Sequence, residues 1–285
     1  MSFCHITPIS CLGLVTGRPA HLTLAHLVEE SEEYAAFYRK EAENGATIIM
    51  DNSAFEMYKR NLPMYDSNKL IEMAKKSGAD YIALSDYPDQ PGEVTVNAAE
   101  ELAYQVKDAG FGTFFIPQSK IGDIDDLTET FDWAFGSELV DYIGYSILAI
   151  PNAYGVEKGN KLQRFFARWK FIEHLKDETS LTTKGRLKKH HFLGMVDGPN
   201  EIELIKSAFP FALDTWDSSA AVWAGISGVS FDGSPTGLLN GKIETEVDFH
   251  IANLSREQVS RAMNNIAYID NLWYSGSFKP ETLWD

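Results

Sequence analysis

Residues 46 to 56 read ATIIMDNSAFE, an apolar run that turns abruptly polar. The run from Ala46 to Met50 is short and rich in β-branched residues, which predicts a buried strand. Asp51 follows where the strand becomes a loop, so its carboxylate is not expected in the core. In parallel α/β proteins, ligands bind at the carboxyl ends of the strands because the loops leaving them converge there. Asp51 is therefore a candidate for chemistry if other strands bring matching groups to the same end.

The same strand-then-helix unit recurs along the chain. The apolar runs predict eight strands, at residues 21–28, 46–50, 80–86, 112–118, 142–147, 191–196, 211–217 and 228–231. Amphipathic patterns predict helices between them, at 31–43, 67–77, 94–109, 123–136, 160–176, 199–208 and 218–224. Ser67 is a candidate N-cap and Gly78 a candidate stop for one of these helices. Strict alternation implies a parallel sheet, and eight such units close into a (β/α)8 TIM barrel.

Length and composition fit a single domain of this kind. The chain has 285 residues, and a (β/α)8 barrel typically has about 250. Its content of 44% hydrophobic and 23% charged residues is ordinary for a soluble globular protein. We expect one catalytic domain over residues 1–285, with an N-terminal extension at 1–20 and a C-terminal helix and tail at 254–285.

Several classes of protein are disfavoured by what the sequence lacks. No apolar run approaches the roughly 18 residues of a membrane span, and the N-terminus does not resemble a signal peptide. We therefore expect a cytoplasmic protein with no membrane partner. The two cysteines, Cys4 and Cys11, rule out a disulfide framework and argue against a thiolate zinc site. We expect no metal and no cofactor.

Charge is distributed unevenly along the chain. The net charge is −16, yet residues 158–191 carry ten Lys or Arg against three acids. Nonspecific nucleic-acid affinity comes from basic surface, so the average argues against indiscriminate binding to polyanions. The basic segment remains a candidate for a local contact with phosphates.

Four predicted strands end in a polar side chain suited to catalysis or binding: Asp51, Asp86, Gln118 and Asp217. Any one of them could be only the cap of the next helix, since Asp is common there. In a closed barrel all four would converge on one end. The set therefore indicates a site rather than four separate caps.

The motifs around these residues resemble those of the tRNA-guanine transglycosylases, in the same order over residues 45–240. Asp51-Asn52-Ser53-Ala54-Phe55-Glu56 resembles that family's Asp-Ser-Gly-Gly-Phe-Gln, and Ser85-Asp86-Tyr87-Pro88 its second aspartate motif. Phe115-Ile116-Pro117-Gln118 is similar to its Gln-bearing strand, and Ile143–Ala149 to its Leu-Ala-Val-Gly segment. Residues 191–196, followed by Gly198-Pro199, resemble its Tyr-Leu-Met-Gly-Val-Gly, and Leu213–Asp217 its Asp-Met-Phe-Asp-Cys. No single match is specific, but the ordered set is.

The resemblance implies roles for the strand-end residues. Asp217 would be the nucleophile that attacks C1′ of the nucleotide and expels guanine, and Asp51 the general acid and base. Asp86 would accept hydrogen bonds from the purine and Gln118 would donate to its O6. The purine would also meet backbone groups near Leu148 and Ala149, and the side chains of Phe55 and Leu193 would sandwich its ring. The alternative for Phe55 and Leu193 is plain packing in the core.

Departures from the family's pattern point to one branch of it. That family carries a Cys-rich zinc subdomain after the nucleophile strand, whereas here no cysteine follows Cys11. The family's arginines after the nucleophile are also missing from residues 218–222. The pattern favours the 7-deazaguanine DNA transglycosylases of phages and bacteria, with DNA and a free base such as preQ0 or preQ1 as partners, in the host cytoplasm if phage-encoded. Activity on tRNA is the alternative.

On this interpretation the basic segment would track the phosphates of the nucleic acid. Its candidate contacts are Arg164, Arg168, Lys170, Lys188 and Lys189. A solvated helix face and a mobile loop would explain the same charges. We expect a structural role for His190 and His191.

Two other functions remain open. A barrel glycoside hydrolase could use Asp51 and Asp217 as its two carboxylates, with Trp216 or Trp223 as a sugar platform, but Asp86 and Gln118 would then lack a purpose. A catalytically silent partner subunit is the other possibility, although it would have no need for two carboxylates in one site. The sequence does not indicate an oligomeric state.

Overall fold

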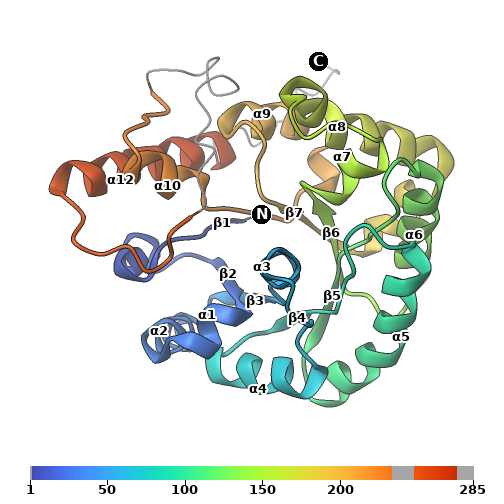
Figure 1. Ribbon diagram of the computed structural model, residues 1–285, viewed down its shortest axis with the longest axis horizontal. Helices are drawn as coiled ribbons and strands as arrows, with labels where there is room; N and C mark the ends of the chain where they lie inside the picture. Colours follow the sequence, from blue (N-terminus) through green and yellow to red (C-terminus); the bar gives the residue numbers. More distant parts are fainter. Residues whose placement is uncertain (1, 233–246, 275–285) are drawn as a thin grey trace, which may run out of the picture.

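Eight parallel strands form a nearly closed barrel with helices around its outside (Figure 1). The computed structural model describes residues 2–232 and 247–274. The strands are hydrogen-bonded in the order β1-β8-β7-β6-β5-β4-β3-β2, and β1 lies beside β2 where the barrel closes. The predicted (β/α)8 TIM barrel, in a single domain, is therefore confirmed. We call the end at which the carboxyl ends of the strands lie the mouth.

The strands are short and follow the apolar runs of the sequence. They are β1 (Ser2–His5), β2 (Ala20–Leu24), β3 (Thr47–Asp51), β4 (Tyr81–Ala83), β5 (Gly112–Phe115), β6 (Tyr142–Ser146), β7 (Lys189–Leu193) and β8 (Thr215–Ser218). The main helices are α1 (Ala25–Glu30), α2 (Glu32–Glu43), α3 (Ala54–Arg60), α4 (Ser67–Ser77), α5 (Gly92–Asp108), α6 (Ile124–Gly136), α7 (Ala149–Ala153), α8 (Lys161–Glu178), α9 (Pro199–Ala208), α10 (Ala220–Ile226) and α12 (Arg256–Tyr274). Short 3-10 helices occupy some of the connections, the first of them at Ile9–Val15.

The N-terminal residues are part of the barrel, so the predicted extension over 1–20 is wrong. Strand β1 pairs with β8, with Cys4 opposite Asp217. The predicted strand at 228–231 does not form, because β1 already occupies that edge of β8. Phe231 is instead buried, and its backbone N–H donates to Asn265 Oδ1 of α12 at 2.8 Å. The predicted tail beyond residue 274 lies outside the described residues.

The other predicted elements differ from the structure mainly at their ends. The strand predicted over 21–28 ends at Leu24 and continues as α1, because a short apolar run does not distinguish a strand from a buried helix. Helices α4 and α9 have the predicted bounds. Helix α4 ends at Gly78 as predicted, with a φ of +73°, which glycine adopts readily. Its N-cap is Asp66 rather than Ser67, because the Asp66 side chain accepts from the Lys69 N–H at 2.9 Å.

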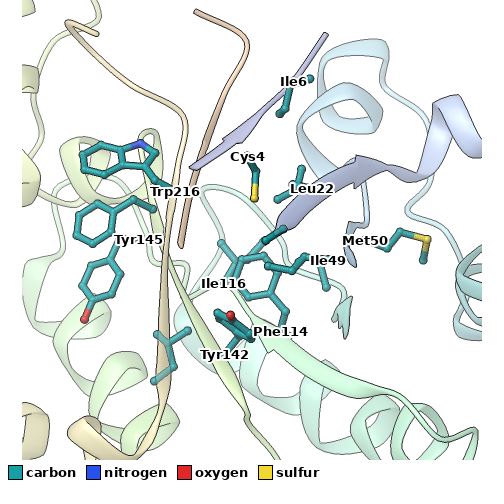
Figure 2. Packing of buried hydrophobic residues seen from close by; sticks show 14 of the residues in the cluster. Cys4, Ile6, Leu22, Ile49, Met50, Phe114, Ile116, Tyr142, Tyr145 and Trp216 are labelled. Carbon is teal, nitrogen blue, oxygen red and sulfur yellow. The ribbon is translucent and has the colours of Figure 1, made fainter. Parts of the chain in front are cut away.

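Alternate residues of each strand point into the barrel. Figure 2 shows Leu22, Ile49, Phe114 and Tyr142 gathered between the strands, while Trp216 lies on the other side of its strand. Side chains two residues apart share a face of a strand. Asp51 and Asp217 are therefore in phase with the inward-pointing residues and stand at the mouth.

Among the described residues, no helix is both long and apolar enough to cross a membrane.

Candidate active site

A tight turn connects Asp51, the last residue of β3, to α3. Its Oδ1 accepts from the backbone N–H of Ser53 at 2.5 Å, and Ser53 adopts a left-handed conformation with φ +58°. The Ser53 hydroxyl lies 2.9 Å from Nδ1 of His26, which holds the turn from the neighbouring element α1. Helix α3 then lies across the middle of the ring of strands when the barrel is viewed along its axis (Figure 1). The turn thus places the Asp51 carboxyl beneath a short helix that covers the mouth.

Asp86 is the centre of a buried hydrogen-bonded cluster. Its two carboxyl oxygens accept from Asn52 Nδ2 at 2.9 Å and from Gln118 Nε2 at 2.5 Å, and Asn52 also donates to the carbonyl of Leu84. Burial raises the pKa of Asp86 to about 6, although the two amide donors favour its ionised form and oppose the shift. Asp86 is therefore ionised at neutral pH and titrates just below it.

Asp217 is held by a histidine on the adjacent strand. Its Oδ1 lies 2.9 Å from Nε2 of His191, and the backbone N–H of Gly194 approaches the same oxygen at 3.4 Å. Only 6% of Asp217 is exposed, and His191 is fully buried. His191 and Gly194 thus both approach Oδ1 of Asp217, and neither of them approaches Oδ2.

The carboxylates at the mouth share one electrostatic environment. The pKa of Asp51 is raised well above its ordinary value, first by burial and then by the negative charges of Glu56, Asp86 and Asp217, while the Ser53 N–H opposes the shift. The pKa of Glu56 on α3 is also raised, mainly by burial. The negative charges that act on Asp51 thus belong to one residue of α3 and to residues that follow or lie near the carboxyl ends of two other strands. Asp51 is the group among them best suited to carry a proton near neutral pH.

Replacing Asp51 with Asn is expected to stabilise the fold at neutral pH. A carboxyl whose pKa is higher in the folded state than in the unfolded state lowers stability as the pH rises from the unfolded value, about 4, towards the folded value. Asp51→Asn removes that loss, so its advantage over the wild type should grow between pH 4.5 and 7.5. Urea unfolding at both pH values measures it.

The matched control for this prediction is Asp125→Asn, which removes an exposed carboxylate on α6 by the same change. An Asp51→Asn variant that is less stable than the wild type at pH 7.5 would contradict the electrostatic account of the mouth.

The predicted apolar contacts occupy different positions around the mouth. Phe55 lies on α3 with 40% of its surface exposed, and Lys59 Nζ sits 4.3 Å from its ring centre. Leu193 ends β7, partly buried, and packs over Gly144, where a Cβ would come within 2.8 Å of its Cδ1. Phe55 is therefore not a core residue, and Leu193 is positioned at the inner wall of the mouth.

The backbone donors of Leu148 and Ala149 are already engaged. Both N–H groups donate to the Ser146 hydroxyl at 3.1 Å, and the Leu148 carbonyl accepts from Asn152 at 3.0 Å. These bonds form the first turn of α7. A purine edge could use the two donors only by displacing Ser146.

Arg168 was predicted to contact phosphates, and the structure contradicts this. The side chain is completely buried, and its Nε donates to Glu201 Oε1 at 2.8 Å. Its other nitrogens donate to the carbonyls of Tyr145, Leu193 and Gly194 at 2.8–3.0 Å. Arg168 therefore ties the carboxyl ends of β6 and β7 to α9 and supports the wall of the mouth from behind.

The basic residues before β7 lie at the wrong end of the barrel for the predicted role. Lys189 is the first residue of β7, and its Nζ donates to the hydroxyl of Tyr81, the first residue of β4. Lys188 donates to the carbonyls of Ser137 and Val140 in the loop before β6. A nucleic acid seated at the mouth would not reach the amino ends of these strands. Of the predicted phosphate contacts, only Arg164, partly exposed, and Lys170, exposed, remain compatible with such a role.

The sequence-based reasoning missed three residues of this site. The sequence alone assigns no separate role to Asn52 or Glu56 and predicts only a structural role for His191. The phase of β7 could have indicated His191, which is two residues before Leu193 and on the same face of the strand. The roles of Asn52 and Glu56 depend on Asp86 and Asp217, which come from distant segments.

The fold and the mouth together define a TIM barrel whose strand ends present three aspartates, a glutamine and a buried histidine. Neither the models of known protein families nor the curated proteins contain a match to the chain. Within residues 2–232 and 247–274, no three His, Cys, Asp or Glu side chains are grouped in a way that could hold a metal ion. Cys4 and Cys11 are both buried and unpaired with each other.

Proposed function

We propose that the protein is a base-exchange transglycosylase that replaces guanine in DNA with a 7-deazaguanine through a covalent aspartyl-glycosyl intermediate. The observation that carries this proposal is the buried Asp86–Gln118–Asn52 cluster in the same mouth as Asp51 and Asp217. An acid flanked by two amides is suited to reading the edge of a purine. The two remaining aspartates are the pair of groups that a double displacement requires.

The cluster has spare capacity for a purine. A carboxylate has about four lone-pair sites, and each Asp86 oxygen uses only one of them on an amide. Two acceptor sites remain for N1–H and N2–H of guanine, and the second N–H of Gln118 can donate to O6. Adenine offers the opposite pattern on that edge, so the cluster would reject it.

The chemistry follows from the two remaining acids. Asp217 attacks C1′, the C1′–N9 bond breaks, and its electron pair leaves with guanine, which takes a proton from Asp51. In the second half, ionised Asp51 removes the N9 proton of the 7-deazaguanine, N9 attacks C1′, and Asp217 leaves. The raised pKa of Asp51 suits the first step because it keeps the proton available near neutral pH.

Guanine affinity is expected to fall below about pH 6. Asp86 can accept from both purine donors only when ionised, and its pKa is about 6. Affinity is therefore present above that value and is lost as the pH falls through it, approaching about tenfold per pH unit. Calorimetric titration of the protein with guanine between pH 5 and 8 measures this fall in affinity.

Gln118→Leu provides the companion measurement for this pH dependence. The substitution removes a donor that favours ionised Asp86, so the fall in guanine affinity should occur at a higher pH. Binding of guanine should also be weaker at every pH. Affinity that stays flat from pH 5 to 8 would show that Asp86 does not read the purine.

Exposed aromatic residues on α3 support a nucleic-acid partner. Phe55 and Tyr58 expose 40% and 52% of their surfaces, and the exposed cations Lys59 and Arg60 lie on the same helix. Proteins hold extruded bases by stacking them on aromatic rings, while nearby basic side chains contact the phosphates of the nucleic acid. Asp86 and Asp217 expose only 4% and 6% of their surfaces, so the mouth has to open when a nucleotide enters.

An exchange assay tests the proposed function. The protein is incubated with DNA or tRNA labelled in guanine, with and without free preQ0 or preQ1, and release of label is followed. Release from DNA with incorporation of the added base is expected. Release from tRNA alone would overturn the DNA assignment, and release from neither would overturn the transglycosylase.

The rival glycoside hydrolase loses one of its two candidate platforms. Trp216 is fully buried on the outer face of β8, where it stacks on Phe192 and donates to the Gly194 carbonyl. Trp223 lies partly buried on α10. Hydrolysis of a simple glycoside together with failure of the exchange assay is the result that would favour this rival.

A further inference from the structure

We propose that two buried side chains, Thr215 and His191, form a hydrogen-bonded chain that positions Asp217 so that its Oδ2 is the attacking oxygen. The inference rests on the proposed function for the identity of the reaction, but the chain itself is a property of the fold. His191 is thereby a positioning residue, which acts through Asp217 rather than on the nucleotide.

The chain runs along the inside of the barrel towards the mouth. Nε2 of His191 lies 2.9 Å from Asp217 Oδ1, and Nδ1 lies 2.7 Å from the Thr215 hydroxyl. His191 and Thr215 are buried, and Tyr142 points into the barrel beside Phe114 (Figure 2). The Phe114 ring meets His191 edge-on at 5.2 Å and restricts rotation of the imidazole.

Counting protons fixes the direction of every bond. An ionised carboxylate only accepts, so Nε2 of His191 must carry the hydrogen that it shares with Asp217. A neutral imidazole then presents Nδ1 as an acceptor, and the Thr215 hydroxyl donates to it. Each hydrogen is used once, and one tautomer of His191 is selected.

This arrangement makes the two oxygens of Asp217 unequal. Oδ1 faces His191 and the Gly194 N–H, which hold it in place and draw on its electron density. Oδ2 is left as the oxygen that can form the bond to C1′. A freely rotating carboxylate would present either oxygen and would lose the alignment that an attack needs.

Substitutions at His191 separate positioning from packing. Gln reaches as far as Nε2 and can still donate to Asp217, whereas Asn reaches only as far as Nδ1 and cannot. We expect His191→Asn to slow single-turnover formation of the adduct between protein and DNA by about 10- to 100-fold, the effect of one hydrogen bond to a charged group. The KM values for DNA and for the free base should be unchanged, and His191→Gln should restore most of the rate.

Two further variants complete the series. Thr215→Val removes the hydroxyl that selects the tautomer and should lower the rate less than His191→Asn does. His190→Gln changes the neighbouring buried histidine, which faces the other side of β7 and bonds Tyr145 and the Gly185 carbonyl. It should leave the rate unchanged whatever it does to the melting temperature. Equal rates for His191→Asn, His191→Gln and the wild type would overturn the inference.

A spectroscopic measurement keeps the inference separate from the proposed function. In ¹⁵N-histidine protein, the signal that disappears in His191→Gln should show protonated Nε2 and unprotonated Nδ1. A proton on Nδ1 instead would overturn the chain, even in a fully active enzyme. If the wild type fails to exchange bases, the proposed function falls, and the same spectrum still decides whether the chain exists.

Discussion

Asp217→Ala is expected to eliminate the covalent adduct between protein and DNA and to lower base exchange by about 10⁴-fold or more, the usual scale for loss of a nucleophile. The reason is geometric as well as chemical. Asp217 is the acid at the mouth whose oxygen is aligned by His191, and no other carboxylate in the described residues shares that partner. Denaturing gels of the protein with labelled DNA detect the adduct directly, and the exchange assay measures the rate.

The matched control for this loss is Asp214→Asn. Asp214 lies three residues earlier, before β8 begins, and accepts from the backbone N–H of His190 at 2.8 Å. It sits at the amino end of the strand, so its removal should leave the adduct intact. Asp51→Ala gives a third pattern, because the adduct should still form, but slowly, without a proton for the leaving base. An adduct that survives Asp217→Ala and vanishes in Asp51→Ala would reverse the two assigned roles.

Arg168→Ala is expected to destabilise the fold by about 3–5 kcal/mol, the scale for removing one partner of a buried ion pair. The substitution leaves Glu201 buried, and its carboxylate loses the Arg168 Nε donor and the second nitrogen at 2.7 Å. It also removes one donor from each of three backbone carbonyls at the ends of β6 and β7, of which the Gly194 carbonyl keeps the Trp216 indole N–H as a donor. Urea unfolding measures the change.

Lys170→Ala is the control for Arg168, since it removes an exposed cation from the same helix and should alter stability by no more than about 0.5 kcal/mol. The double variant Arg168→Met/Glu201→Met should recover part of the lost stability, because it leaves no unpaired charge. If Arg168→Ala instead kept full stability and reduced the salt dependence of DNA binding, the result would support the predicted contact of Arg168 with DNA phosphates.

The location of the basic residues changes what a nucleic acid could touch. The cations of residues 184–189 lie in the loop before β7 and at its first residue, at the end of the barrel away from Asp51 and Asp217. Two exposed cations, Lys59 and Arg60, lie instead on α3, the helix that also carries Phe55 and Tyr58. The electrostatic contact and the stacking contact of the proposed complex thus come from the same short helix.

Much of the fold could be predicted from local pattern. Apolar runs and helical periodicity located seven of the eight strands, and glycines such as Gly78 marked where helices end. The strand that was not predicted is β1, because Ser2–His5 is four residues long and has no periodicity of its own. Its strand conformation depends on pairing with β8, which lies more than 200 residues away in the sequence.

By itself, the sequence determined that this chain is a parallel barrel and that Asp51, Asp86, Gln118 and Asp217 stand at the carboxyl ends of strands. These are consequences of short-range periodicity, since a strand's phase fixes which side chains point inward and its direction fixes which end they reach. Only the tertiary structure decided that Arg168 is buried, that Lys188 and Lys189 lie at the opposite end, and that His191 holds Asp217. Each of these outcomes depends on which distant segments meet, because the cost of burying a charge or a polar hydrogen is set by the partner that it finds there.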